Sequence, residues 1–301
     1  MPDLAKRALG RWFGWASDAG GRDAAAERPG LAALLADPAY ELIPGTAAAQ
    51  AIAALPAASR VTVTCSPRSR IPGTLTMTAE LAAAGHRVVP HLAARLVAPG
   101  MLADIADTLT RHAIDEVFVV AGDAAEALGP YGSTVDLLPD LLDACPHVQR
   151  VGVAGYPDGH PLLTPGDVRR ELLAKQQLLT ERGVAGWVST QMCFDPRLVR
   201  SWIESERAAG VTLAVHLGVP GVVDRARLVR IGARLGVGAT LRFASKQGGA
   251  VARLVAPGGY DPLQVIAPLA GDADRLGIER LHVFTFNSVA ETVAWRDALL
   301  R

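Results

Sequence analysis

The chain has 301 residues, half of them apolar, and its 30 basic and 30 acidic side chains leave no formal net charge. Without a surplus of Lys and Arg to displace counterions from phosphates, this composition argues against a nucleic-acid-binding protein. Cys65, Cys145 and Cys193 are widely spaced, which is typical of reduced thiols rather than of a disulfide framework. The length allows either two domains or a single α/β barrel.

Residues 1–38 are predicted to form a helical extension and a linker ahead of the main domain. Trp12, Phe13 and Trp15 give the first segment an aromatic face, interpreted as a lid or plug, with a membrane or partner anchor as the alternative. Residues 16–30 are rich in Gly, Ala, Asp and Arg and predict a flexible connection. No apolar stretch resembles a signal peptide or a membrane span, so a cytoplasmic protein without a membrane partner is expected.

From Ala39 onward, short apolar runs alternate with longer amphipathic segments. The runs predicted as strands are Tyr40–Ile43, Arg60–Cys65, His86–Leu92, Asp115–Gly122, His147–Gly155, Gly186–Gln191, Val211–Leu217 and Arg280–Asn287. Segments with apolar residues three and four apart, predicted as helices, include Thr74–Ala84, Ala103–Arg111, Val168–Arg182 and Pro196–Ala209.

Eight such alternations predict a single (β/α)8 TIM barrel over residues 39–301. The competing arrangement is an open doubly wound sheet, but no G-x-G-x-x-G motif follows the first strand. The Gly-rich segment Gly236–Gly259 interrupts the alternation and is predicted to be an excursion that faces the substrate.

Polar residues at the carboxyl ends of the strands are the candidates for an active site, because the loops after the strands build it in this fold. Glu41 lies inside an apolar strand, where a buried carboxyl group suits general acid catalysis. Asp123 follows Gly122, which allows the backbone to approach a ligand closely. The alternatives are a buried carboxyl group in a structural network for Glu41 and a helix or turn cap for Asp123.

The histidines raise the possibility of a metal centre. His91, His160 and His216 come from three different strands, but neither an H-x-H nor an H-E-x-x-H motif is present, so no metal is predicted. Cys193 lacks a His and acid partner in the sequence and is interpreted as a buried thiol rather than a nucleophile.

With these strand ends laid out, the chain resembles the methylenetetrahydrofolate reductase family, whose members are (β/α)8 enzymes. Seven stretches match in family order: Tyr40–Pro44, Val61–Thr64, Pro90–Leu92, Gly122–Asp123, Gly155–Pro161, Thr190–Asp195 and His282–Asn287. The resemblance runs from about residue 39 to the end of the chain.

The resemblance implies reduction of 5,10-methylenetetrahydrofolate to 5-methyltetrahydrofolate. Glu41 matches the family's general acid, which protonates N10 so that the five-membered ring opens to a 5-iminium cation. Asp123 matches a carboxylate beside the pterin, and Gln191 matches the amide that hydrogen-bonds the pterin. Further residues expected to contact the folate are Thr190, Phe194 and Asn287, and those expected to contact the cofactor are Thr64, His91, Gly122, Tyr156 and His160.

The chain departs from the family where its flavin is bound. Ala121 replaces an Arg, and Leu172, Leu178 and Leu179 occupy positions aligned with polar flavin anchors, with Lys175 as the remaining cation. These departures indicate the flavin-independent branch known from actinobacteria, in which NADH or NADPH delivers hydride directly and FAD is absent. The alternatives are an FAD-dependent reductase and a folate-binding barrel without catalytic activity.

Overall fold

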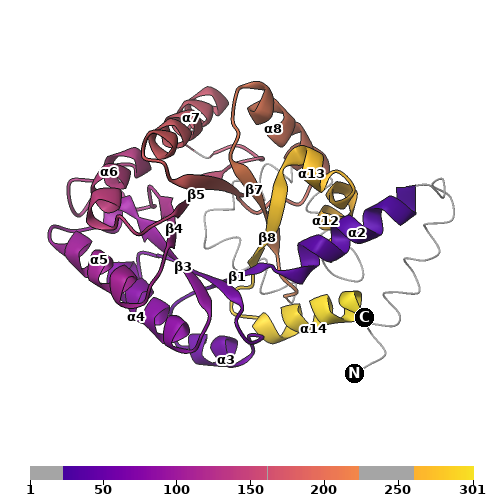
Figure 1. Cartoon of the computed structure of the whole chain (residues 1–301), viewed down its shortest axis with the longest axis horizontal. Coiled ribbons are helices and arrows are strands. Elements are labelled where there is room, and N and C mark those ends of the chain that lie inside the picture. Colours follow the sequence, from indigo (N-terminus) through magenta and orange to yellow (C-terminus); the bar gives the residue numbers. More distant parts are fainter. Residues whose placement is uncertain (1–22, 161, 224–260) are drawn as a thin grey trace.

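The computed structural model describes residues 23–160, 162–223 and 261–301, and within them eight parallel strands close into a barrel in the order β1 to β8 (Figure 1). The strands are β1 Ala39–Leu42, β2 Arg60–Val63, β3 Arg87–Ala93, β4 Glu116–Val120, β5 Arg150–Gly155, β6 Ala185–Thr190, β7 Ala214–Pro220 and β8 Ile278–Phe284. Because β8 pairs with both β7 and β1, the sheet has no free edge. The predicted (β/α)8 TIM barrel is therefore confirmed.

Helices surround the barrel between successive strands (Figure 1). They are α2 Asp23–Ala36, α3 Ala48–Ala53, α4 Arg70–Ala83, α5 Met101–Arg111, α6 Thr134–Ala144, α7 Pro165–Glu181, α8 Pro196–Ala208, α12 Leu263–Ala270, α13 Ala273–Leu276 and α14 Val289–Leu300, with a short 3-10 turn, η1, at Ala94–Leu96. The predicted strands and helices lie at these places, with ends displaced by up to four residues. None of the described helices is both long and apolar enough to cross a membrane.

Side chains alternate between the two faces of each strand, so the barrel has an outer apolar layer and a filled interior. On the outer face, residues such as Val61 and Val63 are completely buried within the layer between strands and helices. Inside, a small apolar cluster of Val89, Phe118 and Trp187 is surrounded by buried polar groups. A polar interior of this kind is unusual for a purely structural core and directs attention to its function.

The predicted flexible connection is wrong from residue 23 onward, because that segment forms helix α2. Leu34 and Leu35 of this helix are buried in the same cluster as Val265 and Ile266 of α12. Gly30 allows close approach of the two helices, since a Cβ atom there would lie 2.2 Å from the carbonyl oxygen of Ala270. Tertiary packing thus stabilises a helix whose composition is typical of a linker. The aromatic segment before it and Gly236–Gly259 lie outside the described residues.

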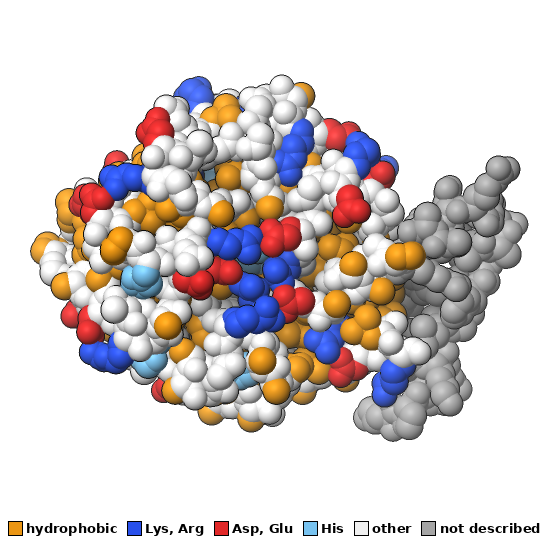
Figure 2. Space-filling model, viewed as in Figure 1, with side chains coloured by type: hydrophobic (Ala, Val, Ile, Leu, Met, Phe, Trp, Pro, Cys, Tyr) orange, Lys and Arg blue, Asp and Glu red, His pale blue; other side chains and the backbone are white. Residues whose placement is uncertain are grey.

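Charged side chains occupy the amino-terminal ends of the strands, where the barrel interior begins. Arg60 Nη1 lies 2.5 Å from Glu116 Oε2, and Arg150 Nη2 lies 2.9 Å from Glu279 Oε2. The Arg150 guanidinium group is also 5.4 Å from the centre of the Trp187 ring. Figure 2 shows basic and acidic side chains gathered at the centre of the face in view. In TIM barrels this end serves stability, which leaves the opposite end for chemistry.

Candidate active site

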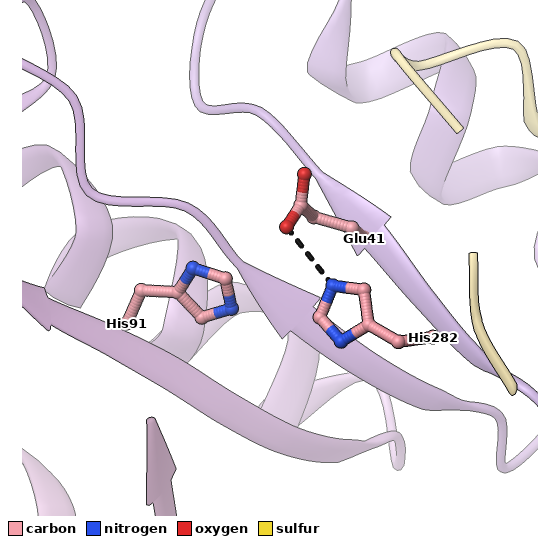
Figure 3. A group of neighbouring side chains, drawn as sticks. All are labelled: Glu41, His91 and His282. Carbon is pink, nitrogen blue, oxygen red and sulfur yellow. Dashed lines mark hydrogen bonds and ion pairs between the residues drawn. The ribbon is translucent and has the colours of Figure 1, made fainter. Parts of the chain in front are cut away.

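A chain of hydrogen bonds inside the barrel joins Glu41 of β1, His282 of β8 and Ser189 of β6. Glu41 Oε2 lies 3.0 Å from His282 Nε2, and the other ring nitrogen, Nδ1, lies 3.0 Å from Ser189 Oγ. All three side chains are buried, although 11% of the Glu41 side chain stays exposed. Figure 3 shows the second carboxylate oxygen of Glu41 pointing away from His282. The carboxyl group therefore has one fixed oxygen and one free to meet a ligand.

The main chain around Glu41 is held by residues at the end of β8. Thr285 Oγ1 donates to the carbonyl oxygen of Glu41 at 2.5 Å. The amide of Asn287 donates to the carbonyl oxygen of Ile43 and accepts from the Ile43 amide, each at 2.9 Å. Phe286 and Asn287 take left-handed backbone angles, with φ of 50° and 63°. Two such residues in a row are costly, and strain of this kind persists where surrounding contacts impose it, commonly at functional sites.

His91 of β3 lies on the other side of this group (Figure 3). Its ring centre is 4.6 Å from that of Phe118 and 6.0 Å from that of His282. Burial lowers its pKa to about 4, against the attraction of Glu41, so the ring is neutral near pH 7. Its Nε2 atom is buried and has no hydrogen-bond partner among the described residues. Buried polar atoms are rarely left unpaired, so this atom is suited to a ligand or water.

Thr62 on β2 and Thr64 just after it add further unpaired polar atoms. Thr62 lies beside Glu41 in the sheet, and Thr64 follows the last residue of β2. Their Oγ1 atoms are buried and, within the described residues, form no hydrogen bonds. Thr64 was predicted to contact the cofactor, and its free hydroxyl group agrees with a ligand contact without establishing which ligand.

Glu41, His91 and His282 also bring together the residue types that bind transition metals. One ligand atom from each lies within 4.8 Å of the other two. Two imidazoles and a carboxylate are a known ligand set for zinc and iron. Here, however, Glu41 Oε2 and His282 Nε2 hydrogen-bond each other, so a cation would have to separate them.

The three histidines considered from the sequence as metal ligands are not brought together. His216 stacks on Trp187 with ring centres 5.0 Å apart, and its Nε2 lies 3.6 Å from Glu279 Oε2 near the amino-terminal ends of the strands. His160 follows β5 and packs edge-on against Tyr156 with ring centres 4.7 Å apart.

A second polar group forms around Tyr156 and His160. Burial raises the pKa of Tyr156, and the charge of Asp123 adds to this effect. Burial lowers the pKa of His160, which Asp123 opposes and Lys175 of α7 reinforces. Asp123 thus lies close enough to affect the protonation of both rings, and Lys175 close enough to affect that of His160. Three of the predicted site residues are brought together here, together with a cation that can meet a phosphate.

Gly122 precedes Asp123 and has a left-handed backbone with φ of 91°. A Cβ atom there would lie 3.0 Å from the Cβ of Ala93. The need for glycine is therefore explained by the turn and by β3, whereas the predicted approach to a cofactor stays a prediction.

The residues predicted to bind the folate differ in how free their side chains are. Gln191 is exposed, with its Oε1 accepting from the amide of Met192 at 2.9 Å. Thr190 is buried and its Oγ1 accepts from the Gly218 amide at 2.8 Å. Phe194 is also buried, and Asn287 bonds the main chain of β1. The structure thus gives Thr190 and Asn287 a role in the fold, and their substrate contacts stay predictions.

Cys193 is a buried thiol, as predicted. Its Sγ donates to Asp158 Oδ1 at 2.6 Å, which links the loops after β5 and β6. Burial raises the pKa of this thiol far above its usual range, with the Asp158 carboxylate adding to the effect. A thiol so firmly protonated does not act as a nucleophile at neutral pH.

The leucines that indicated a lost flavin site belong largely to the core. Leu172 and Leu179 of α7 are 2% and 1% exposed, and Leu178 packs against the apolar cluster. Residues seven apart lie on one helix face, and here that face meets the barrel wall. The Lys175 side chain is mostly buried, with Nζ 3.7 Å from Glu171 Oε2. Leu172 and Leu179 therefore do not report on flavin binding, because any residue at these positions would face the core.

Sequence reasoning did not single out His282 and Ser189 as site residues. Both lie at inward positions of their strands, and His282 stands two residues before Phe284, which is beside Glu41 in the sheet. Counting alternate residues along a predicted strand would have placed His282 inside the barrel. The partner it bonds there depends on the register between strands β8 and β1.

Comparison with known proteins gives limited similarity. No model of a known protein family matches the chain. Over 80 residues the chain is 32% identical to methylenetetrahydrofolate reductase 2 of Saccharomyces cerevisiae, a match that covers 27% of this chain and 13% of the yeast protein. The match spans only 13% of the yeast protein's length, so the chain resembles a short segment of that reductase.

Solved structures give more distant likenesses. A 2,3-dimethylmalate lyase of the PEP mutase/isocitrate lyase superfamily superposes with a TM-score of 0.48 at 12% identity, covering 89% of this chain and 82% of that one. The deoxyribose phosphate aldolase from Aeropyrum pernix gives 0.42 at 15% identity, covering 93% and 99%. Similarity at this level carries no argument about activity.

Proposed function

We propose that this chain is an oxidoreductase that reduces 5,10-methylenetetrahydrofolate to 5-methyltetrahydrofolate, with hydride from NADH or NADPH. The observation that carries the proposal is Glu41, a nearly buried carboxyl group with one oxygen held by His282 and the other directed away from it (Figure 3). The partial similarity to a yeast methylenetetrahydrofolate reductase supports the choice of substrate.

The proposed reaction begins with a proton transfer from Glu41. The O–H bond of the carboxyl group breaks as an N–H bond forms at N10 of the folate. The bond between N10 and the methylene carbon then breaks with its electron pair going to N10, and N5 forms an iminium cation. Hydride from the dihydronicotinamide reduces the methylene carbon to a methyl group and leaves NAD(P)⁺. We assign the stabilisation of this cation to the carboxylate of Asp123, which follows β4.

The cofactor side of the site is assigned to the group around Tyr156, His160 and Lys175. The partly buried ammonium group of Lys175 is suited to a nucleotide phosphate, and two aromatic rings offer a packing surface. We propose direct hydride transfer without flavin, for which Ala121 remains the main support. The FAD-dependent reductase is the second candidate, because Lys175 would serve a flavin phosphate equally well.

Replacing Glu41 with Gln tests the assignment of the general acid. Gln keeps the shape and a hydrogen bond but has no acidic proton, so we expect kcat to fall by about 10²–10⁴ while KM for the folate stays near wild type. The matched control is Glu181→Gln, a similar change at an exposed position on α7. Unchanged turnover in Glu41→Gln would remove Glu41 from the mechanism and favour a folate-binding barrel without catalysis.

The colour and kinetics of the purified protein separate the two cofactor hypotheses. Direct transfer requires both substrates bound together, so initial-rate plots should intersect, and added FAD should not change the rate. A stoichiometric flavin absorption spectrum with parallel initial-rate plots would contradict direct transfer and establish the FAD-dependent reductase.

A further inference from the structure

His282 is linked to Glu41 on one side and to Ser189 on the other, and both links use ring nitrogens. The ring is buried, with 2% exposure, between strands β1 and β6 across the barrel interior. The charged and titratable groups given by the structure around Glu41 are His282 from β8 and His91 from β3, with the Ser189 hydroxyl group behind His282. His91 brings no positive charge near pH 7, because burial keeps its ring neutral.

While Glu41 is protonated, two arrangements of protons satisfy the hydrogen bonds of this chain, but only one still does after the proton has left. In the first, the Ser189 hydroxyl group donates to His282 Nδ1, and the ring carries its hydrogen on Nε2 and donates it to Glu41 Oε2. In the second, Nδ1 donates to Ser189 Oγ and Glu41 Oε2 donates its own proton to Nε2, so that loss of this proton would set the lone pair of Nε2 against the carboxylate. In the first arrangement the acidic proton of Glu41 belongs on Oε1, the oxygen that points away from His282 (Figure 3).

We propose that His282, with its tautomer fixed by Ser189, is a positioning residue that directs the acidic proton of Glu41 to Oε1 and stabilises the carboxylate left after proton transfer. The proposal rests on the proposed function of Glu41 as a general acid. The Oε1–H bond breaks as the bond to the substrate nitrogen forms, and the hydrogen bond from Nε2 to Oε2 persists throughout. No second proton has to move in this step.

The end of β8 completes the arrangement through the main chain. Thr285 holds the carbonyl oxygen of Glu41, and Asn287 holds both backbone groups of Ile43. The side chain and the backbone of Glu41 are thus fixed by one strand and the left-handed turn that follows it. Preorganisation of this kind removes the need to reorient the acid at each turnover.

Two substitutions of His282 distinguish a hydrogen-bond donor from mere bulk. A Gln side chain places its amide nitrogen near the position of Nε2, whereas the shorter Asn matches Nδ1. We expect His282→Gln to keep kcat within about tenfold of wild type and His282→Asn to lose about 10–100-fold, with KM for the folate unchanged, since one hydrogen bond to a charged group is lost. His112→Gln on the barrel exterior serves as the control.

The separation of kcat from KM gives a readout that a purely structural role would not produce. Loss of the Nε2–H group removes a hydrogen bond to the carboxylate formed during proton transfer, so kcat should fall in His282→Asn while KM for the folate stays unchanged. The amide of His282→Gln keeps the donor, so its kcat should stay near wild type. Equal kcat for the two variants, with both folded by circular dichroism, would overturn the proposal.

Nitrogen-15 NMR of labelled histidine tests the arrangement without turnover. We expect a hydrogen on Nε2 and none on Nδ1 of the His282 ring in the wild type, and Ser189→Ala to give a mixture of tautomers. Hydrogen on Nδ1 in the wild type would overturn the proposal, as would a stoichiometric metal lost on His282→Asn. If the Nε2–H tautomer is found but no folate is reduced, the proposed function fails while the pairing of His282 with Glu41 stands.

Discussion

Single residues inside this barrel take their chemical character from their neighbours. The sequence marks Glu41 as a carboxyl group inside an apolar strand, and the structure adds the His282 ring at 3.0 Å and a side chain that retains 11% exposure. His91 is neutral because the interior excludes water from it. A histidine that is buried in its neutral form lowers the free energy of unfolding at acidic pH.

The pH dependence of stability follows from His91. Its pKa is about 4 in the folded state against the ordinary histidine value of 6.5, so between these values the unfolded chain binds a proton that the folded chain does not. The free energy of unfolding should therefore fall as pH drops from about 6.5 to 4, by about 3 kcal/mol from this residue. Urea unfolding of the wild type and His91→Gln at several pH values checks this. A slope equal in both proteins would contradict it.

Individual helices and strands of the barrel place some residues in the core and others at the candidate site. Helix α7 places Leu172 and Leu179 against the barrel wall and Lys175 near His160. Strand β8 and its following turn hold Glu41 by both side chain and backbone. One strand therefore does much of the positioning that the proposed chemistry requires.

Substitutions on α7 test which face carries the packing. Leu179→Ala should lower the free energy of unfolding by about 2–5 kcal/mol, because a completely buried side chain leaves a cavity. Gln177→Ala on the exposed face of the same helix loses its hydrogen bond to Glu181 and should change it by about 0.5 kcal/mol or less. Chemical denaturation measures both. Similar losses for the two would show that the assigned face is wrong.

In the whole molecule, ion pairs that stabilise the fold and residues of the candidate site lie at opposite ends of the barrel. Ion pairs such as Arg60 with Glu116 lie at the amino-terminal ends of the strands, whereas Asp123 and Tyr156 follow the carboxyl ends of β4 and β5. Changes at one end should therefore leave the other intact.

Glu116→Gln tests this separation. The Arg60 and Glu116 side chains are only 10% and 13% exposed, so removing one charge leaves the other poorly compensated and should cost about 3 kcal/mol of stability. Asp107→Asn, which breaks the exposed pair with Arg111, should cost less than about 1 kcal/mol. Reductase turnover below the unfolding temperature should equal wild type in both variants. A loss of turnover in folded Glu116→Gln would show that the two ends are coupled.

The sequence by itself determined the barrel, because eight apolar runs and their amphipathic partners leave few other ways to bury their surface. It also indicated Glu41, since a carboxyl group in an apolar strand is informative without any structure. The prediction of a flexible connection was wrong for residues 23–30, because packing against α12 outweighs local composition.

Only the tertiary structure decided which residues meet. The register of β8 against β1 and the closure of the barrel bring His282 to Glu41, residues 241 positions apart in the chain. The structure also assigned Leu172 and Leu179 to the core, because helical spacing fixes which residues share a face but not what that face meets. Hydrogen bonds and burial depend on distances across the barrel, and a linear pattern does not contain them.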